Sequence, residues 1–171
     1  QRVRTRCKPP SDNDELIARG ISPFQPEKVS IEAGRLMLKR IEELMNDGQV
    51  FSFETTLSSK TFLNTVIDAK AKGYFVTLIF FWLDYVQLAK DRVRKRVLEG
   101  GHFIADHVIE RRYKSGIKNL FTIYHMHVDS LLIYDNSNAE ASLIAEKEKN
   151  NDFVIHASDK FQSIKAFYHE Q

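Results

Sequence analysis

Residues 74–83, YFVTLIFFWL, decide the fold class of this chain. The stretch is apolar without alternation and rich in β-branched and aromatic side chains, a pattern typical of a strand buried on both faces of a parallel sheet. It is only about half as long as a segment that crosses a bilayer. We therefore expect a strand buried on both faces here and no membrane partner.

Strand and helix patterns alternate on both sides of this stretch. We expect strands at 49–55 and 130–134, a hairpin of 143–147 with 153–156, and helices from Pro26 to Gly48 and at 61–72, 86–98, 107–126 and 159–168. This order predicts a three-layer α/β/α sandwich with a mainly parallel sheet. The basic arm 1–13, QRVRTRCKPPSDN, contains Pro9-Pro10, which disfavour a helix or a central strand, so we expect a poorly ordered arm and one domain over 14–171.

The composition is that of an ordinary globular protein. Of 171 residues, 43% are hydrophobic, and the formal net charge of +2 gives no sign of a nucleic-acid partner. The single Cys excludes an internal disulfide and a multi-cysteine zinc site. No basic-then-apolar leader opens the chain, which predicts a cytoplasmic location. The first residue is Gln1 rather than Met, so we expect that the natural chain starts further upstream.

Three carboxylates follow predicted strands: Glu54, Asp84 and Asp135. If these strands are parallel, the three acids lie along one edge, where open sheets bind their ligands. Acids there can hold a metal, bind a sugar hydroxyl or accept its proton. For Asp84, capping of the next helix is the favoured interpretation. For Glu54, whose helix starts later, we favour function.

Arginines lie on both sides of a glycine break, Gly100-Gly101-His102. Arg92 and Arg96 precede the break, and Arg111 and Arg112 follow it. Guanidinium groups bind phosphate at two points, so the segment 100–115 suits a mobile lid over phosphates. A solvated helix surface explains the same charges equally well.

Taken together, eight segments resemble the zeta-toxin family of P-loop kinases, in particular its small proteins labelled as predicted ATPases. They are ARGISPF (18–24), IEAGRLMLKRI (31–41), FSFETTLSS (51–59), KGYFVTLIFFWLD (72–84), RVRKRVLEGGH (92–102), IERRY (109–113), KNLF (118–121) and YDNS (134–137). The resemblance implies a nucleotide-kinase-like fold that uses ATP and Mg²⁺. It also implies a nucleotide-sugar substrate of the UDP-N-acetylglucosamine type and an antitoxin protein as partner.

The resemblance also implies roles for individual residues. Glu54 matches the acid that contacts substrate hydroxyls, and Thr55 and Thr56 fall in the substrate-side loop. Arg111 and Arg112 match lid arginines that face the ATP phosphates, and the same lid segment holds Arg96 and His102. No metal ligand is identified.

The family's catalytic base is the Asp of an N-x-D block. An ungapped match places Asn13 at the Asn and Glu15 at the Asp, and Asp14 takes that place with a one-residue slip. Ser115 occupies a lid position that is often Arg. The base is therefore assigned to Glu15 or Asp14.

The sequence lacks the family's first strand and its phosphate loop, G-x-x-x-x-G-K-[ST]. That loop supplies backbone donors, the phosphate-binding Lys and a Mg²⁺ ligand. The chain is then either a clipped form of an active kinase or a degenerate homologue, and in both cases we expect a poor kinase that binds ATP weakly. Two alternatives remain: a non-catalytic binding module, and a relative of polynucleotide 5′-hydroxyl kinases. A basic stripe with interleaved aromatics, which would support the second, is absent from the sequence.

Overall fold

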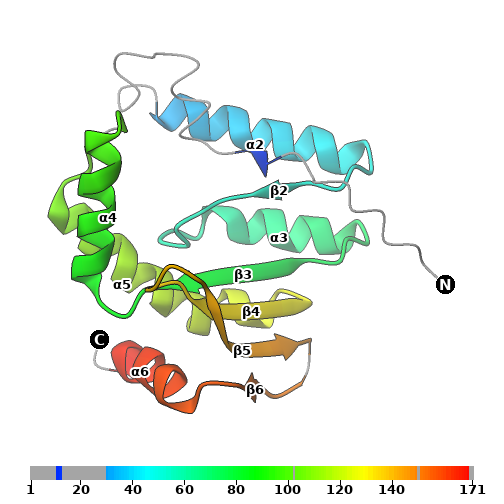
Figure 1. Ribbon diagram of the computed structural model, residues 1–171. Helices are drawn as coiled ribbons and strands as arrows, with labels where there is room; N and C mark the ends of the chain where they lie inside the picture. The colour runs from blue at the N-terminus through cyan, green and yellow to red at the C-terminus, as the bar shows by residue number, and fades with distance from the viewer. Residues whose placement is uncertain (1–10, 13–29, 102, 150, 170–171) are drawn as a thin grey trace. The chain divides into compact units, whose positions relative to one another are not determined.

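The computed structural model describes residues 11–12, 30–101, 103–149 and 151–169 (Figure 1). The chain forms two compact units, Gln1–Thr55 and Thr56–Gln171, here called the N-terminal and C-terminal units. The domain expected over 14–171 spans both of them. The two base candidates, Asp14 and Glu15, and the lid residue His102 lie outside the described residues.

The N-terminal unit contains strand β1 (Ser11–Asp12), helix α2 (Ser30–Asn46) and strand β2 (Ser52–Phe53). β1 pairs in parallel with β2, so two residues of the arm form a short strand in a two-stranded sheet. The apolar stripe of α2 is buried as its spacing predicts: Ala33, Met37, Ile41 and Leu44. The helix ends at Asn46, and Gly48, two residues later, has a φ of +66° that suits a left-handed C-terminal cap.

The C-terminal unit is built on a mixed sheet with the strand order β3-β4-β5-β6. Its strands are β3 (Thr77–Trp82), β4 (Ser130–Asp135), β5 (Ser142–Glu148) and β6 (Val154–Ile155). β3 and β4 are parallel, whereas β4–β5 and β5–β6 are antiparallel. The α/β class is correct, but the prediction of a mainly parallel sheet is wrong here. The connection 136–141 is too short for the crossover that a parallel β5 requires.

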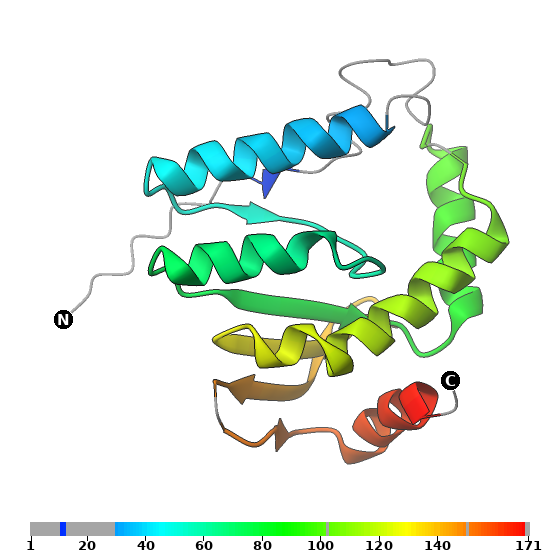
Figure 2. The same ribbon diagram turned by 180° about the vertical axis from the view of Figure 1, so that it is seen from behind.

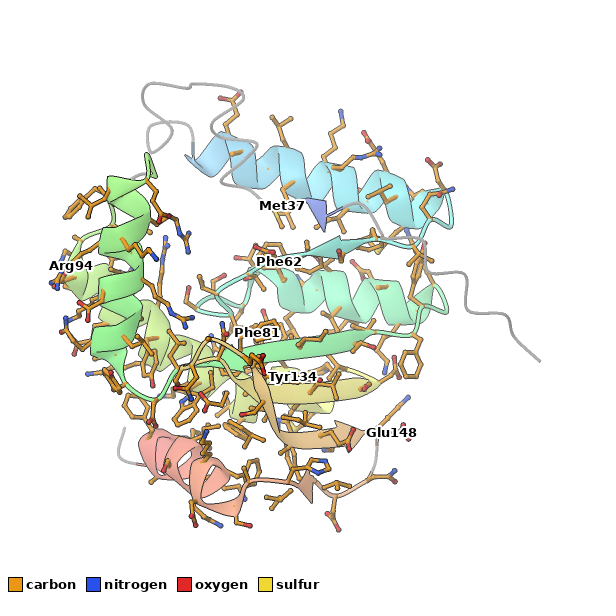
Figure 3. All side chains as sticks on the ribbon, viewed as in Figure 1. Met37, Phe62, Phe81, Arg94, Tyr134 and Glu148 are labelled. Atoms are coloured by element: carbon orange, nitrogen blue, oxygen red, sulfur yellow. The ribbon has the colours of Figure 1, made fainter. Side chains whose placement is uncertain are left out.

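Strand β3 is not buried on both faces as its composition suggested. It lies at the edge of this sheet and alternates: Leu78, Phe80 and Trp82 belong to the core side, whereas Ile79 and Phe81 are 48% and 55% exposed. Phe81 contacts the ring of Tyr134 on the second face, with ring centroids 5.8 Å apart (Figure 3). Only one face of β3 therefore contributes to the core cluster.

The helices of the C-terminal unit are α3 (Thr61–Ala71), α4 (Val86–Leu98), α5 (Asp106–Thr122), the short 3₁₀ helix η2 (Tyr124–Met126) and α6 (Ser158–His169). From behind, Figure 2 shows α5 crossing the face of the sheet, where Ile117 and Leu120 join the core with Leu131 and Ile133. The C-terminal hairpin and last helix form close to their predicted positions. The predicted helix 107–126 is divided, because α5 ends before η2. No helix in the described ranges has the length and apolar character that crossing a membrane requires.

Candidate functional site

Two of the three predicted carboxylates lie at the carboxyl ends of neighbouring parallel strands. Asp135 is the last residue of β4 and pairs in register with Trp82, and Asp84 follows Trp82 by two positions. This placement confirms the expected common edge for Asp84 and Asp135. Glu54, which is exposed, and Thr55 close the N-terminal unit after β2.

Asp135 has a structural role. It is buried, forms an ion pair with Lys160 of α6, and accepts a 2.9 Å hydrogen bond from the backbone N–H of Ser137. Burial by itself would raise the pKa of Asp135, but the bonds from Lys160 and Ser137 outweigh burial and lower that pKa below its ordinary value. The carboxylate therefore remains charged and anchors α6 to the sheet.

Asp84 is exposed and does not cap the next helix. The N-terminal cap position of α4 is Tyr85, and no side chain bonds the open N–H groups there, so the predicted capping role is wrong. The backbone N–H of Asp84 donates to Ser137 Oγ over 2.9 Å, and Arg92 Nη2 donates to Asn136 O over 2.6 Å. These bonds fix the backbone at the sheet edge and leave the Asp84 carboxylate facing solvent.

Tyr113 of α5 was not singled out by the sequence patterns, yet it ties α5 to this edge. Its hydroxyl donates to Leu83 O over 2.6 Å. Burial raises the pKa of Tyr113 to about 12, and the charge of Asp84 acts in the same direction. The phenol is therefore a neutral hydrogen-bond donor at physiological pH.

Helices α4 and α5 form a hairpin, and Figure 1 shows α4 beyond the carboxyl end of β3. α4 has no fully buried side chain. Two ion pairs link it to α5: Lys90–Glu110 at 3.2 Å and Arg94–Asp106 at 2.8 Å. Pairs as exposed as Arg94–Asp106 contribute at most about 1 kcal/mol. The contacts between α4 and α5 are therefore made largely by charged side chains near the surface.

The turn between these helices needs its glycines. Gly100 has a φ of +92°, which few other residues adopt. A Cβ on Gly101 would lie 2.8 Å from Arg96 O, too close for any side chain. The sequence prediction of a glycine turn at this point is confirmed.

The predicted arginine cluster separates into two groups. Arg92 donates to Asn136 O in the loop after β4, whereas Arg96, Arg111 and Arg112 are exposed. Neither Arg111 nor Arg112 forms an ion pair with any other residue in the part of the chain that the structure describes. Their guanidinium groups can therefore bind an anion without first breaking such a pair.

The loop 56–59 follows the Thr56 boundary and has an unusual backbone. Leu57 has a φ of +52° although its side chain is 3% exposed within the core. A bulky residue in the left-handed region costs about 1–3 kcal/mol, so surrounding contacts must hold it. Asn119 Nδ2 donates to Leu57 O over 2.7 Å, and Tyr124 Oη donates to Ser59 O over 3.0 Å. The substrate-side loop of the resemblance is thus clamped by α5 and η2.

The residues present fit an ATP site only in part. Exposed arginines suit phosphate groups, but none of the 171 residues forms a G-x-x-x-x-G-K-[ST] loop. Within the described ranges, no group of three or more His, Cys, Asp or Glu side chains could hold a metal ion. The described residues therefore do not form a complete site for ATP or Mg²⁺, and we derive no step through either.

Comparison with known proteins identifies a relative but does not assign a function. No family model matches the chain, and no solved structure matches it. A protein of Haemophilus influenzae, described as an uncharacterized protein, is 32% identical over 102 residues, which cover 60% of this chain and 72% of that protein. The chain belongs to the same family as this Haemophilus influenzae protein.

Proposed function

We propose that this member of the family is a zeta-toxin-like phosphotransferase domain that binds a nucleotide sugar of the UDP-N-acetylglucosamine type. One observation carries the proposal: α5 bears the exposed Arg111 and Arg112, and the same helix clamps the loop 56–59 through Asn119. Helix α5 therefore carries the arginines assigned to the phosphate donor and also contacts the loop assigned to the acceptor, which suits a reaction that depends on positioning.

The chemistry of these side chains supports phosphate transfer to a hydroxyl. Arginines bind phosphate oxygens in two-point fashion. The exposed Thr56 hydroxyl shares a 2.8 Å hydrogen bond with Ser58 Oγ and has further bonding capacity for a sugar. Asp84 adds an exposed carboxylate at the sheet edge. We include in the proposal the finer fold, a three-layer sandwich of P-loop-kinase type, which the parallel β3–β4 pair with α4 and α5 in the connection between its strands supports.

The proposal makes different predictions for binding of the acceptor and for transfer of phosphate to it. The sequence contains no Walker A loop, so these 171 residues offer no cradle of backbone N–H groups to the β- and γ-phosphates. Lid arginines alone supply only a few charge-assisted bonds before ordering costs, which corresponds to roughly millimolar affinity at best. We expect nucleotide-sugar binding, weak ATP binding and little transfer.

Calorimetric titration of the full chain tests this proposal. UDP-N-acetylglucosamine should bind, and Thr56→Ala should weaken binding by about tenfold, the factor expected for one hydrogen bond. Thr77→Ala, which changes another exposed threonine on β3, is the matched control and should leave the affinity unchanged.

Three results would contradict it. Absence of nucleotide-sugar binding by the folded chain refutes the acceptor assignment. Tighter binding of a 5′-hydroxyl oligonucleotide favours the polynucleotide-kinase alternative. A micromolar dissociation constant for ATP with Mg²⁺ shows that the expectation of weak ATP binding is wrong.

A further inference from the structure

Helix α5 approaches the loop 56–59 with one face. A Cβ on Gly116 would lie 2.7 Å from Thr56 O, so the helix backbone touches the loop directly at that point. Three residues later, Asn119 donates to Leu57 O over 2.7 Å. Residues three apart share a face of a helix, so both contacts come from the same side of α5.

Arg112 belongs to this face as well. It precedes Gly116 by four positions and Asn119 by seven, which is close to two helical turns. Along the helix axis its Cα lies about 6 Å from that of Gly116. The exposed Arg112 therefore stands one turn beyond the contact between α5 and Thr56.

We propose that Asn119 is a positioning residue for the acceptor: its bond to Leu57 O holds the loop so that the Thr56 hydroxyl and Arg112 meet one phosphate-bearing ligand together. This inference rests on the proposed function and changes one assignment in it: Arg112 binds the anionic part of the nucleotide sugar, and Arg111 alone remains for the ATP phosphates. The left-handed backbone of Leu57 is unfavourable for a bulky residue, and the bond from Asn119 is one of the contacts that stabilise it.

The positioning role explains why position 119 is an asparagine, although helix α5 itself does not require one. Asn is a mediocre helix former, and Asn119 is half-buried in the interior of α5. An aliphatic side chain would favour the helix more, but it would leave the Leu57 carbonyl without this donor. The side-chain amide of Asn119 therefore serves to hold the loop 56–59 rather than to stabilise the helix.

Asn119→Asp tests the inference, because it keeps the size of the side chain and removes the donor. The matched control is Thr122→Ala, which removes a 2.8 Å bond from Thr122 Oγ1 to Lys118 O that stays inside α5. Two properties are measured on each full chain: amide hydrogen exchange by NMR in the loop 56–59 and in β4, and calorimetric binding of UDP-N-acetylglucosamine. Asn119→Asp should raise both the loop exchange rate and the dissociation constant by about tenfold and leave β4 unchanged, and Thr122→Ala should change neither.

Each of the other outcomes contradicts either the proposed function or the positioning role of Asn119. Wild-type protein that does not bind UDP-N-acetylglucosamine refutes the proposed function, and the positioning role with it. Binding by wild type and Asn119→Asp with equal affinity, or unchanged loop exchange, refutes the positioning role alone. Equal acceleration in β4 also refutes it, because Asn119 would then hold the core rather than the loop. If Asn119→Asp does not fold, Asn119→Ser replaces it, since this variant removes the same bond without adding a charge.

Discussion

Gly116→Ala should destabilise the C-terminal unit, although the same substitution usually stabilises a helix. Alanine is better than glycine in a helix interior by about 1 kcal/mol. At Gly116, however, the added Cβ would lie 2.7 Å from Thr56 O, a backbone atom that cannot rotate away. Gly34 in α2 is the control: apart from the helix's own backbone, no atom of the described residues lies within 4 Å of a Cβ there.

Comparison of the two variants separates the effect of helix propensity from the effect of the close contact between position 116 and Thr56 O. Gly34→Ala should increase the free energy of unfolding by about 1 kcal/mol. Forcing a methyl group into a packed contact costs about 1–3 kcal/mol, so Gly116→Ala should lower the free energy of unfolding by about 0–2 kcal/mol. Because propensity is common to both, their difference of about 1–3 kcal/mol measures the contact between α5 and the loop 56–59.

Urea unfolding provides the measurement. The chain has one Trp, and Trp82 is 3% exposed in the core of the C-terminal unit, so its fluorescence reports on Gly116→Ala. Far-ultraviolet circular dichroism, which detects helix loss, follows Gly34→Ala. A Gly116→Ala chain that is stabilised as much as Gly34→Ala refutes the direct approach of α5 to Thr56, and with it the clamp on the loop.

Three further predictions concern the sheet edge and the lid. Lys160→Met should lower the free energy of unfolding at neutral pH by about 2 kcal/mol, because Asp135 keeps a buried charge. Since the folded-state pKa of Asp135 is lowered, this difference should narrow as pH falls through that pKa, and a difference that persists in strong acid contradicts the assignment. Tyr113→Phe should cost about 1 kcal/mol. In wild type an absorbance titration should show one phenol ionising near pH 12, and stability should fall from pH 10 upward because the unfolded phenol ionises first. Amides of the predicted lid, residues 100–115, should exchange faster than those of β4, and equal protection would argue against a lid.

Local sequence patterns predicted where the helices and strands lie in the chain better than they predicted how the strands pair. The hairpin and α6 could be placed because turn residues and apolar spacing mark them in the sequence. The acids Asp84 and Asp135 could be assigned to one edge because β3 and β4 are parallel. The composition of β3 was misleading, since an apolar strand at a sheet edge and one at its centre have the same composition. The antiparallel return of β5 depends on a short connection rather than on strand composition.

The contacts that shape the candidate site join residues far apart in the chain, and no periodicity marks them. Lys160 and Asp135 are separated by 25 positions, and Asn119 and Leu57 by 62. Leu57 carries no sign of its left-handed backbone, because glycine or asparagine is the usual signal for that conformation. Yet FSFETTLSS and KNLF were already two of the segments on which the resemblance rests. The bond from Asn119 to Leu57 gives a physical reason for the two segments to occur together: one forms the loop, and the other holds it in place.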